Sequence, residues 1–276
     1  MRHRLTSLFD KTATYTLLIG FAFFFFVPLV WLLVASVDPQ ASIALRMPDA
    51  LSLEHFTNLF EEGDVVNWLK NSLIMSLSTM VATSLLATLA AYPLSRVEFP
   101  GKFILMYGLL LTRIMPIPSI IVPVFSISIL LGLINTYLGA ILVLTAIQLP
   151  VALWIMKGFV DTIPAEIEEA AWLDGCNRLT GLIRVVLPLT APGIAVTGMF
   201  AFLGAWGDFL VPFILLRSPQ MFPISIGLYT AFSQRGNVEF GRLAALAILY
   251  SLPAVIIYFL ARQHLVKGMT AGSVKT

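Results

Sequence analysis

The stretch Thr12–Ala35 reads TATYTLLIGFAFFFFVPLVWLLVA and contains no charged residue. A helix needs about 20 predominantly apolar residues to cross a bilayer, so this stretch is long enough to span a membrane. It follows Arg2, Arg4 and Lys11, a charged start that is also typical of a signal peptide. Its apolar run exceeds the about 7–15 residues of a signal sequence, and no convincing small-residue cleavage site follows. We therefore expect a membrane helix that is retained.

The composition of the whole chain points to the same class of protein. Of 276 residues, 58% are hydrophobic and only 12% are charged, and the mean hydropathy is +0.91. Soluble domains carry about 25% charged residues, so a soluble enzyme and a disordered chain are both excluded. The net charge of +2 is far too weak for a nucleic-acid-binding protein. A single cysteine, Cys176, excludes an internal disulfide and a cysteine-rich metal site.

Five further stretches have the length and polarity of membrane spans. The third span contains Pro116, Pro118 and Pro123, and we expect it to be kinked or broken. The pattern predicts an all-α integral membrane protein, with residues 1–276 forming a single transmembrane domain. Its six spans cover about residues 12–35, 72–94, 103–129, 138–156, 191–215 and 241–261.

The distribution of Lys and Arg predicts how the spans are oriented, because cytoplasmic loops carry an excess of both. With the N-terminus inside, most of the 17 basic residues fall on the cytoplasmic side, and Arg113 falls inside the third span. Both termini are then cytoplasmic. Two sizeable loops result, an acidic external one at about 36–70 and an internal one at about 157–190.

The internal loop predicts a short helix outside the membrane, over Asp161–Gly175. Pro164 suits its first turn, and three glutamates near its start favour the positive end of the helix dipole. Gly175 suits a left-handed stop after its last turn. A second helical stretch is expected over 177–186, ending at Leu187–Pro188.

The predicted helix has one face of small residues. Ile167, Ala170 and Ala171 lie on it at i, i+3, i+4 spacing, and the two alanines would let another backbone or side chain approach closely. From these residues alone, an amphipathic helix packed on its own membrane domain explains the pattern equally well.

The wider spacing in this loop resembles the EAA signature of permease subunits of binding-protein-dependent ABC importers. Glu169-Ala170-Ala171 is followed after three residues by Gly175, and after nine more by Val185-x-Leu187-Pro188. The family usually has Ile at the position of Val185. The resemblance implies the type I permease fold, with this loop as the coupling helix that docks in a cleft of a cytoplasmic ATPase. The implied coupling residues are Glu168, Glu169, Ala170, Ala171, Asp174, Gly175, Leu187 and Pro188.

Further motifs are similar to the carbohydrate branch of this family, and within it to the shorter, six-span partner of the maltose-type permease pair. These are Thr112–Pro116, Pro188 with Ala191–Gly193, and the ending Val266–Gly272. The chain departs from the pattern at Gly207, where Asn is expected.

The resemblance implies a transport subunit that moves a carbohydrate or carbohydrate derivative, and no catalytic residue. Its partners would be a second homologous permease, an ATP-binding cassette ATPase dimer and a periplasmic or lipid-anchored solute-binding protein. They would assemble in the lipid of a bacterial or archaeal plasma membrane. ATP and Mg would be held by the ATPases, since this chain has no Gly-x-x-x-x-Gly-Lys-Ser/Thr loop. We expect no metal site, because the three histidines show no ligand spacing.

Two alternatives remain at this stage. Within the family, the substrate could be an amino acid or a polyamine. From a different class, the chain could be a secondary transporter that needs no ATPase. Ion coupling would need several close intramembrane carboxylates, and Asp208 is the only Asp or Glu inside the six predicted spans.

Polar residues in the spans are candidates for the translocation pathway. Arg113 and Asp208 would each cost about 2.5–3.5 kcal/mol if unpaired in a membrane, so each must face protein or water. They either line a cavity near Gln148 and Asn71, or pair with each other, with backbone carbonyls or with the partner permease.

Two further segments have counterparts in the maltose-type family. The outer loop with Gln234, Arg235 and Gly236 corresponds to one that reaches into the docked binding protein, and its alternative is a solvated connector. The ending Lys267–Thr276 resembles a tail that inserts between the ATPases.

Overall fold

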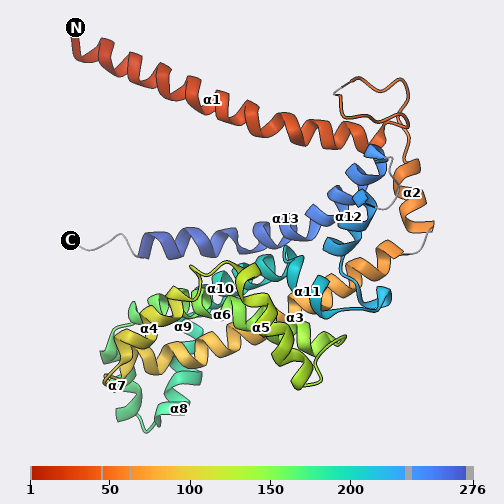
Figure 1. Ribbon diagram of the computed structural model, residues 1–276. Helices are drawn as coiled ribbons and strands as arrows, with labels where there is room; N and C mark the ends of the chain where they lie inside the picture. The colour runs from red at the N-terminus through yellow and green to blue at the C-terminus, as the bar shows by residue number, and fades with distance from the viewer. Residues whose placement is uncertain (1, 45, 62–63, 234–237, 272–276) are drawn as a thin grey trace. The chain divides into compact units, whose positions relative to one another are not determined.

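The structure is a computed structural model that describes residues 2–44, 46–61, 64–233 and 238–271 (Figure 1). These residues form helices joined by loops, and no strand occurs among them. The chain forms two compact units, residues 1–64 with 228–251 and residues 65–227 with 252–276. The all-α fold is confirmed, whereas the single domain over 1–276 stays a prediction.

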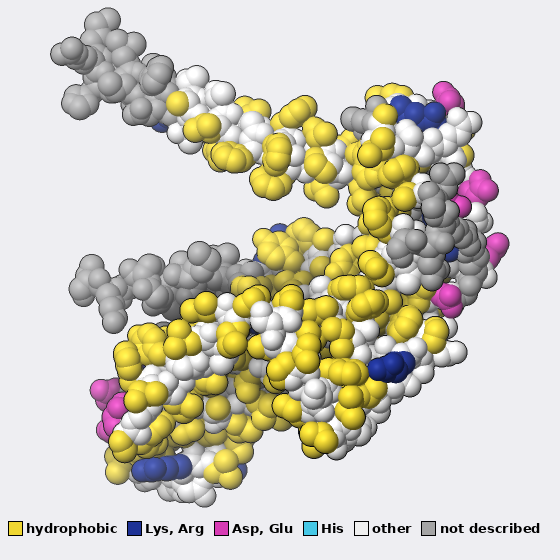
Figure 2. All heavy atoms as spheres, viewed as in Figure 1, with side chains coloured by type: hydrophobic (Ala, Val, Ile, Leu, Met, Phe, Trp, Pro, Cys, Tyr) yellow, Lys and Arg dark blue, Asp and Glu magenta, His cyan; other side chains and the backbone are white. Residues whose placement is uncertain are grey.

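The first unit contains the long helix α1 (Arg2–Val37) and the short helix α2 (Glu54–Glu61). It also holds the end of α12 (Ile224–Ser233) and the start of α13 (Phe240–Ala271). Apolar side chains are exposed along α1, including all four phenylalanines of Phe23–Phe26, and Figure 2 shows the hydrophobic cover. Such a surface suits an apolar environment, as expected for the first span.

An ion pair closes the loop that follows α1. The buried carboxylate of Asp38 accepts hydrogen bonds from Arg46, Nε to Oδ2 at 2.7 Å and Nη2 to Oδ1 at 2.8 Å. The Asp38 carbonyl also lies 3.0 Å from Nε2 of His55 in α2. The hydrogen bonds from Arg46 lower the pKa of Asp38 below its ordinary value, since they favour the charged form.

The second unit is built around three long helices, α3 (Asp64–Arg96), α6 (Tyr137–Asp161) and α10 (Ala191–Trp206). Helices α6 and α10 pack against each other along their lengths. Their close approach depends on glycine, because a Cβ at Gly193 would meet the ring of Phe159. A buried core joins α3, α4, α6 and the internal loop, formed by Ala87, Ala91, Leu94, Met106, Ala152, Leu153, Met156, Val160, Ile163, Leu182 and Val186.

The third predicted span is broken, as its prolines indicated. It consists of α4 (Lys102–Leu111) and α5 (Ile117–Leu130), and residues 112–116 between them are not helical. The extended backbone of Pro116 comes directly before α5.

The fifth predicted span, over 191–215, is also broken, and the sequence analysis did not indicate this break. Helix α10 ends at Trp206 and α11 (Leu210–Leu215) begins three residues after Gly207. Glycine is a poor helix residue, and Oδ1 of Asp208 accepts a hydrogen bond from the Val211 amide in the first turn of α11 at 2.8 Å.

Four single helices of the described residues are long and apolar enough to cross a membrane. A fifth candidate is a pair of helical segments, 178–189 and 191–207, which are bent by 74° relative to each other and would count together as one span. The single helices cover Lys11–Val37, Asp64–Arg96, Tyr137–Asp161 and Phe240–Gln263. The count of six spans and the orientation of the termini stay predictions.

Candidate coupling helix and transport pathway

The predicted helix in the internal loop is present as α7 (Ala165–Leu173). Pro164 directly precedes it in an extended conformation, and Gly175 follows it with a left-handed φ of +91°. The end of α7 is a Schellman motif. The Cys176 amide donates to the Ala171 carbonyl and the Gly175 amide to the Trp172 carbonyl, both at 3.0 Å. The left-handed stop predicted at Gly175 is thereby confirmed.

One side of α7 is open to the surroundings. Ala170 is exposed, Leu173 is 90% exposed and Ile167 is 42% exposed. Ala171 is only half-exposed, so it lies at the edge of this face rather than at its centre. We call Ile167, Ala170 and Leu173, with the exposed Glu166 and Glu169, the outer face of α7.

The opposite side of α7 packs on its own unit. Trp172 lies over Gly181, because a Cβ at Gly181 would come 3.4 Å from its Nε1. Glu168 is only 2% exposed. Of the residues predicted for coupling, Glu169, Ala170 and Asp174 are therefore exposed, whereas Glu168 points inwards.

The second helical stretch continues further than predicted. Asn177 caps α8 (Arg178–Gly181), a π-helical turn η1 (Leu182–Val186) follows, and α9 (Leu187–Leu189) runs through Pro188. The predicted end at Leu187–Pro188 is wrong. A proline ring clashes with the carbonyl four residues before it in a regular α-helix, and the wider π turn ahead of Pro188 accommodates the residue.

A cluster of hydrogen bonds surrounds Glu168. Its Oε1 accepts from Nε of Arg96 at 2.6 Å, and its Oε2 accepts from the hydroxyl of Tyr92 at 2.9 Å. Nη2 of Arg96 also donates to the Ile163 carbonyl at 2.8 Å. Both carboxylate oxygens of this buried group are thus satisfied by the last turns of α3, as a buried charge requires.

Two more contacts extend this cluster towards α6. The hydroxyl of Ser95 donates to Oδ1 of Asp161 at 2.5 Å, and Nζ of Lys157 lies 2.6 Å from Oδ2 of the same residue. Figure 2 shows both acidic and basic side chains, in separate patches, at the end of the unit where α7 and α8 lie.

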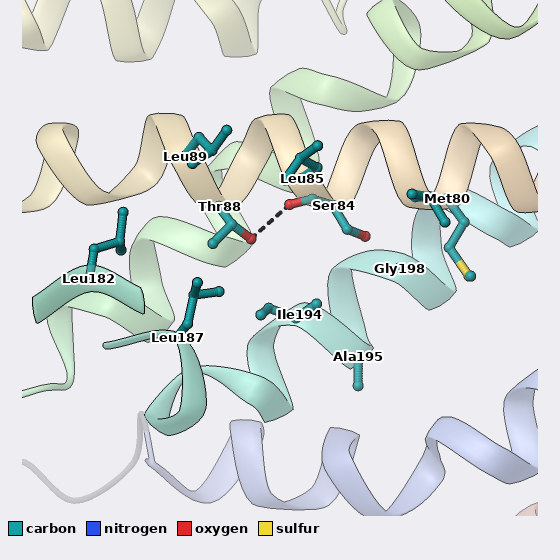
Figure 3. Close-up of a pocket in the computed structure, with 11 residues that line it drawn as sticks. Met80, Ser84, Leu85, Thr88, Leu89, Leu182, Leu187, Ile194, Ala195 and Gly198 are labelled. Atoms are coloured by element: carbon teal, nitrogen blue, oxygen red, sulfur yellow. Dashed lines mark hydrogen bonds between the residues drawn. The ribbon is translucent and has the colours of Figure 1, made fainter. Parts of the chain in front are cut away.

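An apolar cavity of about 440 Å³ lies between α3 and the segment from η1 to α10 (Figure 3). Leu85, Leu182, Leu187 and Ile194 contribute to its apolar lining. The Ser84 hydroxyl, which has no hydrogen-bond partner, points towards Gly198 across the gap. The predicted coupling residue Leu187 thus lines a space beside α3.

The candidate pathway residue Arg113 lies in the break between α4 and α5. Its Nη1 donates to the Ile147 carbonyl of α6 at 3.0 Å. Pro150, three residues further, has no amide hydrogen, so helix hydrogen bonding is incomplete next to this carbonyl. The geometry matches the predicted pairing with a backbone carbonyl.

Gln148 lies where α6 packs against the end of α10. The Gln148 amide lies directly on Gly204, four residues before Asp208. Arg113 therefore binds the residue of α6 that directly precedes Gln148. Gln148 in turn contacts α10 shortly before that helix ends. Their role in translocation stays a prediction.

Asn71 has a different environment. Its Nδ2 donates to the carbonyls of Gln220 at 2.7 Å and Phe222 at 3.0 Å, and its Oδ1 accepts from the Tyr137 hydroxyl at 2.8 Å. It is buried and fully used in fixing this loop, which favours a structural role.

Asn135 fixes the same loop, and the sequence did not identify it. It has a φ of +58°, its Oδ1 accepts from the amides of Arg217 and Ser218, and its Nδ2 donates to the Ser218 hydroxyl. Its residue type could have indicated it, because Asn is more common than most residues at positive φ.

Some predictions fall on residues that the structure does not describe. Gln234, Arg235 and Gly236 lie outside the described residues, and so does the end of the tail after Ala271. Within the part of the chain that the structure describes, no group of three or more His, Cys, Asp or Glu could hold a metal ion.

Comparison with known families decides what this arrangement belongs to. Residues 83–271 match the model of the binding-protein-dependent transport system inner membrane component. The chain belongs to this family of ABC importer permeases. The match includes α7, the Glu168 cluster and the broken spans α4–α5 and α10–α11.

Curated relatives match this permease over most of its length. The maltodextrin transport system permease protein MdxG of Bacillus subtilis (strain 168) is 34% identical over 87% of this chain and 86% of its own. The galactooligosaccharides transport system permease protein GanQ of the same organism is 32% identical over 95% and 94%.

A solved structure shares the fold. It is a bacterial ABC transporter involved in the import of the acidic polysaccharide alginate, which the permease matches with a TM-score of 0.80. The match covers 91% of this chain and 94% of that chain at 20% identity.

Proposed function

We propose that this permease is one half of the translocation pathway of an ATP-driven carbohydrate importer, with the outer face of α7 as the docking surface for an ATPase. Its partners are a second permease in the same bacterial plasma membrane, two cytoplasmic ATPase chains and an external solute-binding protein. The chain itself performs no chemistry: it opens and closes a pathway when the ATPases hydrolyse ATP.

The exposed outer face of α7 is the observation that carries this proposal. Ala170 and Leu173 are exposed, whereas Glu168 on the other side of the same helix is buried and paired. The small side chain of Ala170 allows close approach, and Ile167 and Leu173 offer apolar area to a partner. The Schellman motif and the Arg96–Glu168 pair hold α7 rigidly. Movement of an ATPase bound to its outer face would therefore also move the membrane-spanning helices.

A neutral or weakly charged oligosaccharide is the substrate class that fits best. Maltodextrin and galactooligosaccharides are named for the curated relatives, which cover nearly the whole chain. Arg113 would suit an anionic sugar, but its Nη1 is already bound to the Ile147 carbonyl. The substrate class is therefore taken from the relatives at about one-third identity rather than from the alginate transporter at 20%.

The docking surface is tested by replacing Ala170 with Asp. The substitution puts a charge into a fitted contact, where an unpaired buried charge is costly, and it leaves every predicted span untouched. We expect normal membrane abundance, with loss of the ATPase on co-purification. Glu61→Gln, which removes one charge from an exposed carboxylate on a different helix, α2, is the control and should retain the ATPase. Wild-type ATPase recovery with Ala170→Asp contradicts docking on α7.

The substrate class is tested by uptake. Vesicles containing the purified complex and its binding protein are offered labelled maltotriose, galactobiose, an alginate trisaccharide, an amino-acid mixture and putrescine. We expect ATP-dependent uptake of one of the neutral sugars. Uptake of the amino acids or putrescine alone, or uptake without ATPases under an ion gradient, contradicts the proposal.

A further inference from the structure

The buried carboxylate of Glu168 joins two helices that are far apart in the sequence. It lies on α7, and its partner Arg96 lies 72 residues earlier at the end of α3. The side chain of Glu168 is 2% exposed and that of Arg96 is 20% exposed. Neither residue presents its charged group on the outer face of α7, so this pair is separate from the surface proposed to bind the ATPase.

The bonds of Glu168 lie beside Pro93 in α3, one before it and one after it in the sequence. Pro93 lies inside this helix and removes one of its backbone hydrogen bonds. The Glu168 carboxylate accepts from Tyr92 before Pro93 and from Arg96 after it. One side chain of α7 therefore spans the proline and ties the last turn of α3 to the preceding turn.

Arg96 extends the connection to the segment that leads into α7. Its Nη2 donates to the Ile163 carbonyl, and the neighbouring Ser95 donates to Asp161 at the end of α6. The end of α3 is thus bonded to α6, to the following loop and to α7 in succession. A buried ion pair whose donors and acceptors are used cannot separate without leaving an uncompensated charge, so these elements move together.

We propose that the Arg96–Glu168 pair, completed by Tyr92, transmits movement of α7 to the membrane-spanning part of α3. This inference rests on the function proposed above. Arg96, Tyr92 and Glu168 are positioning residues: they touch neither the ATPase nor the transported sugar. The pair converts displacement of a surface helix into displacement of a span, and the apolar cavity beside Leu187 leaves space next to α3.

The experiment compares transport with ATP hydrolysis in the reconstituted complex. Glu168→Gln keeps the shape of the side chain and an acceptor for Tyr92, but it removes the charge that holds Arg96. We expect the ATPase to co-purify as in the wild type, and sugar taken up per ATP hydrolysed to fall about tenfold, within the range of measured coupling effects. The sugar used is the one with the highest uptake in the panel above.

Two variants make the result decisive. Tyr92→Phe removes only the hydroxyl, and we expect a smaller fall in the same ratio with normal abundance. Glu61→Gln, which changes an exposed carboxylate at the end of α2 and not on α7, should leave the ratio unchanged. If Glu168→Gln does not accumulate in the membrane, Tyr92→Phe alone decides the question.

An unchanged ratio of uptake to hydrolysis in Tyr92→Phe, and in Glu168→Gln where it accumulates, overturns the inference and leaves the pair as a purely structural contact. Failure of the proposed function is recognised separately, because Ala170→Asp would then retain its ATPase. Loss of docking in Ala170→Asp together with a normal ratio in Glu168→Gln contradicts only the role of the ion pair.

Discussion

Gly193 of α10 lies against the ring of Phe159 of α6, so closely that a Cβ at position 193 would come 2.5 Å from the ring carbon Cγ. The contact joins the two most extensively packed helices of the second unit, next to the internal loop that carries α7. An aromatic ring fixed between two helices cannot move aside as a flexible chain end can.

Gly193→Ala should therefore destabilise the permease, by about 1–3 kcal/mol as is typical of overpacking. The measurement is the thermal unfolding of the purified protein in detergent. Gly158→Ala is the matched control in α6, since a Cβ there meets nothing within 4 Å. This control should be neutral or stabilising by about 0.5–1 kcal/mol. Equal unfolding temperatures for the two variants would contradict the close α6–α10 contact.

Sequence reasoning reached the elements whose signals are local. The prolines of the third span predicted its break, and Gly175 predicted the end of α7. The break after α10 was missed, because it involves the hydrogen bond between the Asp208 side chain and the Val211 amide. The presence of Gly207, where the family pattern has Asn, did not predict this break.

Most of the site contacts that could not be predicted from the sequence are polar contacts between residues far apart in the chain. Glu166, Glu168 and Glu169 look alike as three glutamates near a helix start, and only the fold selects Glu168 for Arg96. A spacing signal existed, since Glu168 shares a helix face with Trp172, four residues on. The two carbonyls that accept from Asn71 belong to residues 149 and 151 positions away, and no local pattern identifies them.

The Asp38–Arg46 pair makes the first unit sensitive to acid. The pKa of Asp38 is lowered in the folded state, so the pair stabilises the protein at pH values above the ordinary range of aspartate, near 3.9. This contribution is lost as the pH falls through the lowered pKa. Arg46→Gln should thus reduce the unfolding temperature at pH 7, and its difference from the wild type should shrink as the pH falls below about 3.9.

The control for this pH dependence is Glu61→Gln, an exposed carboxylate at the end of α2. It should follow the wild type at every pH. A constant difference between Arg46→Gln and the wild type from pH 7 to pH 3 would show that Arg46 acts through packing and not through the charge of Asp38.

Variants of Arg113, in the broken third span, test whether this residue is needed for transport of the substrate or for folding of the permease. It is exposed and donates to one backbone carbonyl, so Arg113→Met should leave membrane abundance close to that of the wild type while uptake falls. Arg113→Lys keeps the charge but loses the planar guanidinium, and it should retain part of the uptake. Uptake and abundance are measured in the same membranes, and a fall of both in proportion would show that Arg113 is structural.

Gly175 tests whether the shape of the α7 terminus matters for coupling. A Cβ at this position would meet no atom within 4 Å, so a substitution acts through the backbone alone. Its φ of +91° penalises any residue with a side chain by roughly 1–2 kcal/mol. Gly175→Ala should therefore weaken the bonds that the Gly175 and Cys176 amides donate to Trp172 and Ala171.

The resulting phenotype is a permease that inserts normally and couples poorly. Hydrogen exchange at the amides of residues 175 and 176 should become faster in Gly175→Ala, and ATPase recovery on co-purification should fall. Gly175→Asn is the matched variant, because Asn tolerates left-handed backbone better than Ala, and it should restore part of both signals. If exchange accelerates in Gly175→Ala while ATPase recovery and uptake stay at wild-type values, the Schellman end of α7 is dispensable, and the ATPase must hold this helix in shape without it.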